Sequence, residues 1–153
     1  MKSPAADAYW EEFRKETGLQ GGRYVAAKFG DGPTMADELL GLVLAGRKRA
    51  TASLARDYCR PDGDPFPQEG DYVVWLDGSG HPRCITRTTQ LEVKPLSQVD
   101  DLFAWDEGEG DRTRAWWLDA HRRYFQRQAD REGFSMHDEI ETVFERFQLV
   151  WMG

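Results

Sequence analysis

The stretch that decides the fold is DYVVWLDGSGHPRCITRTTQLEV, residues 71–93. Its first part, residues 71–76, is apolar and rich in β-branched and aromatic side chains, which favours a strand. The sequence DGSG at residues 77–80 is typical of a hairpin turn. Residues 83–93 then predict a long return strand, so we expect an antiparallel pair at the centre of the chain.

An arginine interrupts the pattern of the return strand. Arg87 has the same parity as Ile85, Leu91 and Val93, so strict alternation would place it on their face. Either the arginine points into a partly enclosed space, or a β-bulge shifts the register between them. Both interpretations fit the sequence.

Two helices and a strand are predicted before the hairpin. Ser3 followed by Pro4 is typical of a helix start, and that amphipathic helix should end at Gly18. A second helix should begin near Pro33 with Thr34 as its cap, and should end at Gly46. Residues 50–54 alternate in polarity and predict a short strand. Residues 60–70 carry three prolines and two glycines and predict a loop.

After the hairpin we predict one more helix and one more strand. Asp111 is placed to cap the helix, whose apolar residues recur at helical spacing. Residues 143–151 alternate and predict a final strand. The order of helix, helix, strand, hairpin, helix and strand predicts an α+β chain with a mostly antiparallel sheet.

Composition limits the class of protein. The chain has 153 residues, of which 40% are hydrophobic and 31% charged, as expected of one globular domain. Its net charge of −7 argues against binding polyanions over the whole surface. There is no apolar run of membrane length and no signal-peptide pattern, so we expect a cytoplasmic protein without membrane contact.

Several kinds of reactive site are excluded by their missing motifs. The sequence has no HExxH, paired CxxC, Walker A or GxSxG pattern. Its two cysteines, Cys59 and Cys84, and its three scattered histidines indicate neither a disulfide framework nor a local metal cluster. We therefore expect no metal ligands and no cofactor, while a requirement for a divalent metal is left open.

One basic segment places three cations and two hydroxyls at a helix-to-strand corner: GRKRATAS, residues 46–53. Its cations could bind a phosphodiester, and the pKa of Lys48 should be lowered by Arg47 and Arg49 on either side. The alternative is a helix end stabilised by basic residues, followed by a plain edge strand.

One acidic segment precedes the last predicted helix. Residues 98–111 hold six acidic side chains and no basic one. Within them, Gly108 and Gly110 give the backbone freedom to turn a carboxylate toward a cleft, where it would form an acid–base pair with Lys48. The alternative is an exposed capping loop.

Together these segments resemble the ASCH domains, which have the PUA-like fold. The resemblance runs from about residue 10 to residue 151. It is carried by GRKRATAS at 46–53, GDYVV at 70–74, TTQLEV at 88–93, EGEGD at 107–111 and ERF at 145–147. It implies a small twisted β-barrel of mostly antiparallel strands flanked by helices, and a single ASCH domain over residues 1–153 with an N-terminal helix.

The resemblance also implies RNA or a modified nucleoside as ligand. Some small bacterial ASCH proteins remove the acetyl group from acetylcytidine with a lysine, a threonine three residues later and a glutamate. Lys48 and Thr51 match the first two, and either Glu107 or Glu109 would be the third. Other ASCH proteins resemble ribonucleases acting on single-stranded RNA.

Three functions follow, and we rank RNA hydrolysis first because the length of the chain fits the larger ASCH proteins. In that function Lys48 is the central catalytic residue and a glutamate is the general base. The expected ligand-binding residues are Arg47, Arg49, Ser53, Arg87 and Arg146.

The second function is deacetylation of N4-acetylcytidine, with Thr51 as nucleophile, Lys48 as its base and the glutamate passing the proton to the leaving amine. The third is a non-catalytic RNA or nucleotide-binding module that stacks a base on Trp75 or Trp116. The sequence does not predict the oligomeric state.

Overall fold

The computed structural model describes residues 2–61 and 63–153. The α-helices are α1 (Pro4–Thr17), α2 (Pro33–Leu44), α3 (Asp101–Glu107) and α4 (Arg114–Glu132). The strands are β1 (Tyr24–Ala27), β2 (Ala50–Leu54), β3 (Tyr72–Leu76), β4 (Pro82–Pro95) and β5 (Glu141–Trp151). Short 3-10 helices follow β2 and β4 at Ala55–Tyr58 and Leu96–Gln98. The predicted α+β class is confirmed.

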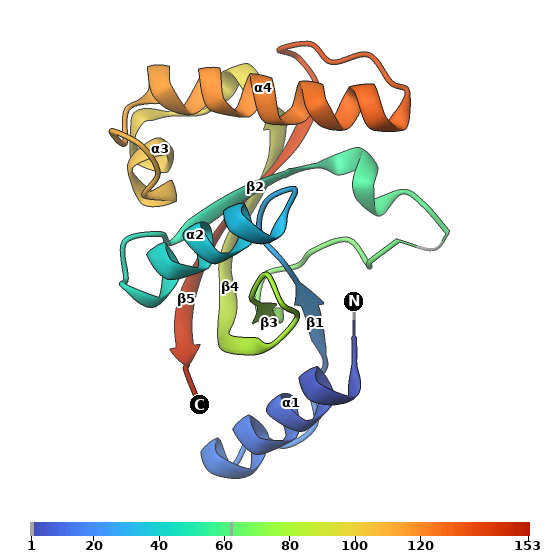
Figure 1. The fold of residues 1–153 in the computed structure, drawn as a ribbon, viewed down its shortest axis with the longest axis vertical. Coiled ribbons are helices and arrows are strands. Elements are labelled where there is room, and N and C mark those ends of the chain that lie inside the picture. The colour runs from blue at the N-terminus through green and yellow to red at the C-terminus, as the bar shows by residue number, and fades with distance from the viewer. Residues whose placement is uncertain (1, 62) are drawn as a thin grey trace.

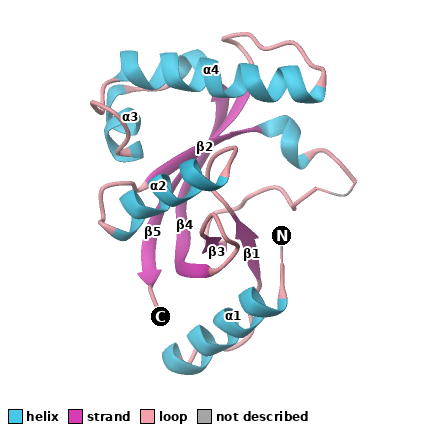
Figure 2. Cartoon of the chain, in the orientation of Figure 1, coloured by secondary structure: helices cyan, strands magenta, loops and turns pink. Residues whose placement is uncertain are grey.

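The strands form one sheet in the order β1-β3-β4-β5-β2, with helices around it (Figures 1 and 2). β1 pairs with β3 in parallel, and the other neighbouring strands are antiparallel. Among the described residues, no ladder joins the edge strands β1 and β2, so the sheet is open and not the closed barrel that the resemblance implied. The edges are linked in the chain through α2, which packs Leu40 and Val43 on the sheet beside Trp75.

The central strands bury side chains on both faces. Val74 and Ile85 pack on the side of α1, where Trp10 and Phe13 form an aromatic cluster with them. Trp75, the next residue of β3, packs on the opposite side with the α2 cluster. This double coverage explains why β3 is apolar along its whole length.

The β-bulge interpretation of Arg87 is confirmed. The pairing of β4 with β5 shifts between Ile85 and Thr86 and again after Thr88. As a result Thr86 and Thr88 are buried, whereas Arg87 is exposed. The extra residues let buried threonines follow a buried isoleucine without turning the arginine inward.

Two helix caps differ from the prediction. Ser3 caps α1 and Gly18 ends it, as predicted. However, α2 begins at Pro33 with Gly32 before it, because a proline suits the first helical position, so Thr34 lies inside the helix. The N-cap of α4 is Thr113, whose hydroxyl accepts from the Trp116 N–H at 3.2 Å, and Asp111 accepts from the Thr113 N–H instead.

Neither β1 nor α3 was predicted from the sequence. β1 has four residues. α3 has seven residues and lies inside the acidic segment that was interpreted as a loop. Asp100 caps α3 by accepting from the Phe103 N–H at 2.7 Å. This short helix matters because its end places Glu107.

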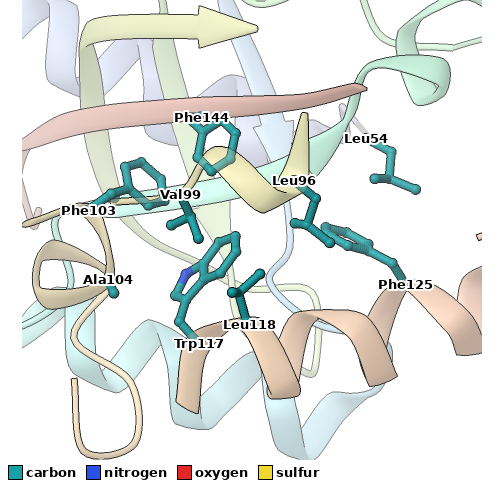
Figure 3. Packing of buried hydrophobic residues seen from close by; sticks show 10 residues of the cluster. Leu54, Leu96, Val99, Phe103, Ala104, Trp117, Leu118, Phe125 and Phe144 are labelled. Atoms are coloured by element: carbon teal, nitrogen blue, oxygen red, sulfur yellow. The ribbon is translucent and has the colours of Figure 1, made fainter. Parts of the chain in front are cut away.

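A third apolar cluster fixes α3 and α4 against β2 and β5 (Figure 3). Phe103 of α3 packs edge-on against Trp117 of α4 and Phe144 of β5. Trp117 is almost completely buried, so α4 is held rigidly above the sheet. Within the described ranges, every helix is too short or too polar to cross a membrane.

Candidate functional site

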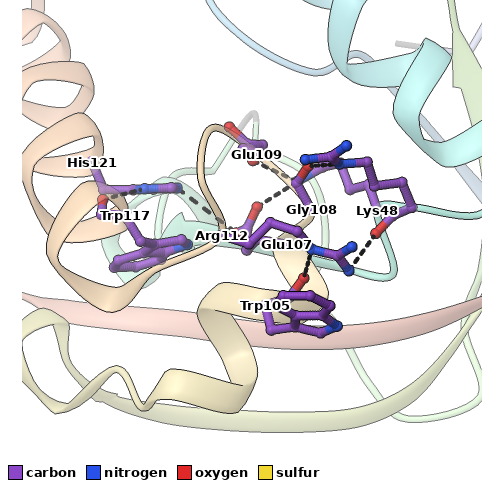
Figure 4. Close-up of polar contacts among 9 residues, drawn as sticks. Lys48, Trp105, Glu107, Gly108, Glu109, Arg112, Trp117 and His121 are labelled. Atoms are coloured by element: carbon purple, nitrogen blue, oxygen red, sulfur yellow. Dashed lines mark hydrogen bonds and ion pairs between the residues drawn. The ribbon is translucent and has the colours of Figure 1, made fainter.

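The site is built around a buried lysine. Lys48 lies in the turn between α2 and β2, where its backbone N–H donates to Leu42 O at 3.1 Å. Its side chain runs into the protein and is only 1% exposed. The ammonium donates to Glu107 and, at 2.8 Å, to Glu109 (Figure 4). Both glutamates that the sequence analysis left as alternatives therefore contact Lys48.

Two glycines bring these carboxylates to the lysine. Gly108 ends α3 with a φ of 72°, and a Cβ there would lie 2.4 Å from Arg47 O. Gly110 has a φ of 57°, and a Cβ there would overlap the Trp116 ring. The left-handed backbone and the close approach both require glycine, so the EGEGD segment can fold tightly against the corner that carries Lys48. The alternative of an exposed capping loop is wrong for Glu107, which is 1% exposed.

His121 of α4 closes the far side of the cluster. Its Nδ1 lies 2.8 Å from Trp117 O and donates to it, and the two rings stack at 3.7 Å between centroids. Its Nε2 lies 3.7 Å from Glu107 Oε1, an oxygen without a hydrogen-bond partner among the described residues. Burial lowers the pKa of His121 to about 4, and the nearby Glu109 offsets only part of this effect. The imidazole is therefore neutral at pH 7.

The charges of the cluster are strongly coupled. Burial alone would lower the pKa of Lys48, but Glu107 and Glu109 outweigh it and raise that pKa above its ordinary value. The predicted lowering by neighbouring arginines is wrong, because neither arginine side chain turns toward the ammonium. Burial raises the pKa of Glu107 well above its usual range, while Lys48 and a hydrogen bond from Glu107 outweigh burial and hold the pKa of Glu109 near 2.

The arginines expected to hold a ligand bind other parts of the protein. Arg47 donates to Gly108 O at 2.8 Å, and Arg49 and Arg146 both bind Asp106, at 3.1 and 3.2 Å. Arg87 lies over the Tyr72 ring at 5.5 Å, on the exposed part of β4. None of these four arginines lines either of the two pockets described next.

Two pockets adjoin the cluster and meet at Thr51. The lysine pocket, with a volume of about 330 Å³, is lined by Lys48, Thr51, Glu107, Glu109 and His121 among others. The strand pocket, with a volume of about 250 Å³, is lined by Thr51, Ser53, Trp75, Glu145 and others. Thr51 and its neighbour Ala52 border both pockets. Together these spaces suit a small ligand of nucleoside size.

Some residues of these pockets were not predicted as site residues. Arg123 and Arg127, one helical turn apart on α4, line the lysine pocket. Their spacing of four residues, which places them on one face of a helix, was a signal in the sequence. Glu145 entered only as part of the ERF motif. Of the two proposed stacking residues, Trp116 lines the lysine pocket, and Trp75 lines the strand pocket.

Three side chains of the cluster could hold a metal ion. Donor atoms of Glu107, Glu109 and His121 lie within 4.8 Å of one another, and the free histidine nitrogen is Nε2. Carboxylates and imidazole are ligands that Zn²⁺ and Mn²⁺ use. However, Lys48 already binds both carboxylates, so a divalent ion there would lie beside a positive charge. We assign no metal to this cluster.

Comparisons with known proteins give a consistent result. The family model of the ASCH domain matches residues 25–151. The fold is similar to the crystal structure of a protein from Enterococcus faecalis V583, with a TM-score of 0.87 and 29% identity over 97% of this chain and 89% of that one. It is also similar to the ASCH domain from Lactobacillus crispatus JV V101, with a TM-score of 0.84 and 30% identity over 97% and 96%. No curated protein matches the chain.

Proposed function

The chain belongs to the ASCH domain family, and from this premise we propose that it binds a nucleoside, free or within RNA, and hydrolyses an amide on its base. The family is linked to RNA binding, which supports this class of ligand. The two adjoining pockets support a ligand of one nucleoside rather than a long strand. The net charge of −7 also favours a short ligand.

The placement of Lys48 between two carboxylates carries the choice of reaction. A phosphodiester that reached its ammonium would also approach Glu109, whose negative charge would repel it. A neutral amide meets no such repulsion. The arginines expected to hold phosphates bind Asp106 and backbone carbonyls instead. Deacetylation of the base of a nucleoside such as N4-acetylcytidine therefore fits better than cleavage of RNA, which was ranked first from the sequence.

We assign the roles as follows. The Thr51 hydroxyl attacks the acyl carbon, and Lys48 accepts its proton. Because Lys48 is protonated at rest, it must first pass its proton to Glu109, the neighbouring carboxylate that is charged at rest. Glu107, whose ionisation burial disfavours, holds the lysine side chain in place. Arg123 and Arg127 border the same pocket, where a ribose phosphate would meet them if the ligand were part of RNA.

The test compares two substrates. Wild type, Lys48→Met and Thr51→Val are incubated with N4-acetylcytidine and, separately, with a short single-stranded RNA, with and without divalent metal, and products are followed by chromatography. We expect cytidine and acetate from the nucleoside, and a loss of at least about 100-fold in both variants. Lys94→Met is the matched control, because Lys94 pairs with Glu92 outside both pockets.

Each other outcome selects another function. Cleavage of RNA that depends on Lys48 would replace amide hydrolysis by the ribonuclease function. If neither substrate changes while cytidine still binds, the protein is a binding module without turnover. Thr51→Val keeps the test valid if Lys48→Met fails to fold, because Thr51 takes no part in the buried ion pairs.

A further inference from the structure

A second buried carboxyl lies outside the lysine cluster. Glu145 of β5 is only 8% exposed and lines the strand pocket. Among the described residues, no lysine, arginine or histidine lies within ion-pair distance of it, whereas the other buried acidic side chain, Glu107, binds Lys48. A carboxyl buried without a cation is costly to ionise, and such groups are found at functional sites more often than elsewhere.

The strand pairing places Glu145 next to the proposed nucleophile. In the antiparallel ladder of β2 with β5, Thr51 lies directly opposite Glu145. Side chains of directly opposed residues point to the same face of a sheet, with Cβ atoms about 5 Å apart. Both residues line the strand pocket, so an acyl group attacked by Thr51 would have its nitrogen within reach of this carboxyl.

The surroundings of Glu145 keep a proton on it near neutral pH. Burial, followed by the charge of Asp71, raises the pKa of Glu145 to about 7, while a hydrogen bond from Thr88 lowers it slightly. The other titratable groups lining the pocket are Lys28, Asp57, Tyr58, Asp64 and Tyr124. Because carboxyl groups outnumber the single lysine in this lining, the pocket favours a proton donor over a bound anion.

We propose that Glu145 protonates the leaving nitrogen when Thr51 attacks the amide, an inference that rests on the proposed function. The bond from Thr51 Oγ to the acyl carbon forms, and the carbon–nitrogen bond breaks. The nitrogen keeps that electron pair and takes the proton of Glu145, so the free amine of the base departs. Water then attacks the acyl-threonine, returns a proton to Glu145 and releases the acid, while Lys48 returns the proton of Thr51.

The test uses leaving groups of different basicity. An amide nitrogen must be protonated to leave, whereas 4-nitrophenolate leaves without a proton. Wild type and Glu145→Gln are therefore assayed on N4-acetylcytidine and on 4-nitrophenyl acetate. We expect a loss of at least about 100-fold in the amide rate, and less than about threefold in the initial burst of 4-nitrophenolate, which is released before Glu145 takes a proton from water. Glu141→Gln, an exposed glutamate of the same strand, is the matched control and should change neither rate.

The outcomes separate this inference from the proposed function. Equal losses on both substrates would show a structural effect and overturn the role of Glu145, as would an unchanged amide rate. Retained ester hydrolysis would show that the variant is folded. No turnover of the amide by the wild type would remove the proposed function, and the inference would fall with it.

Discussion

Removal of the Lys48 ammonium should destabilise the protein in a pH-dependent way. In Lys48→Met the carboxylates of Glu107 and Glu109 lose their cation, although both are largely buried. At the 2.8 Å distance between Lys48 Nζ and Glu109 Oε2, and an effective dielectric constant of about 20, the lost attraction is about 6 kcal/mol. The variant can limit this loss by protonating Glu109, which costs about 4 kcal/mol at pH 7. We therefore expect a loss of about 3–5 kcal/mol in the free energy of unfolding.

The sign of the pH dependence follows from the same groups. In the wild type the pKa of Glu109 is about 2, below its unfolded value, so its stabilising contribution is present above pH 4.3 and is lost as the pH falls toward 2. In the variant the folded carboxyl must bind a proton that the unfolded chain lacks. Its deficit should therefore shrink by about 1.4 kcal/mol for each pH unit between 7 and 5.

Urea unfolding of wild type and variant at pH 7 and pH 5 measures both quantities. The double variant Lys48→Met/Glu109→Gln should lose most of the pH dependence, because the carboxyl that takes up the proton is gone. Lys94→Met, from a partly exposed pair at 3.7 Å, should cost less than about 1 kcal/mol. A deficit below about 1 kcal/mol for Lys48→Met at pH 7, or one equal at both pH values, would refute the reasoning.

Three further predictions concern the surroundings of the cluster. His121, with a pKa near 4, should remain neutral at pH 6 in an NMR titration, and a titration midpoint above 6 would contradict this. Because that pKa lies below the unfolded value, the contribution of the neutral imidazole to the free energy of unfolding should be lost as the pH falls from about 6.5 toward 4. Gly108→Ala should lower the free energy of unfolding in urea by about 2 kcal/mol or more beyond the effect of Gly18→Ala. Both glycines have a positive φ, but only at Gly108 would a Cβ meet a backbone oxygen. Equal effects would be inconsistent with the tight turn. Asp106→Asn should cost about 1–2 kcal/mol in the same assay, since its partner Arg49 is more than half exposed while Arg146 is largely buried; a cost above 3 kcal/mol would show that these pairs hold the segment in place.

Local signals in the sequence were sufficient for most of the fold. The DGSG turn and the apolar runs beside it predicted β3 and β4, and Ser3 and Gly18 predicted both ends of α1. β1 was missed because four residues are too few to show a period. α3 was missed because its acidic residues resemble a solvated loop, although Asp100 was a visible cap. Whether the sheet closes into a barrel depends on contacts between its two edge strands, which are distant in the sequence. No local pattern indicates such contacts, so the open sheet could not be predicted.

The site was predicted in part, and for a different reason. Lys48, Thr51 and the two glutamates were identified by resemblance, and the structure brings Lys48 together with both glutamates. Their protonation states could not be predicted, because the pKa of Lys48 depends on carboxylates about 60 residues away in the chain rather than on its arginine neighbours. The importance of Glu145 depends on its strand pairing with Thr51, which appears only in the folded sheet.

The most direct test of the account is the rate at which wild type and Thr51→Val release cytidine from saturating N4-acetylcytidine, with the affinity for cytidine measured alongside. We expect the variant to lose at least about 100-fold in rate while its affinity for cytidine stays within about threefold. Thr89→Val, from an exposed threonine of β4, should match the wild type in both. A Thr51→Val rate within about twofold of the wild type, or a wild type that releases no cytidine, would contradict the account.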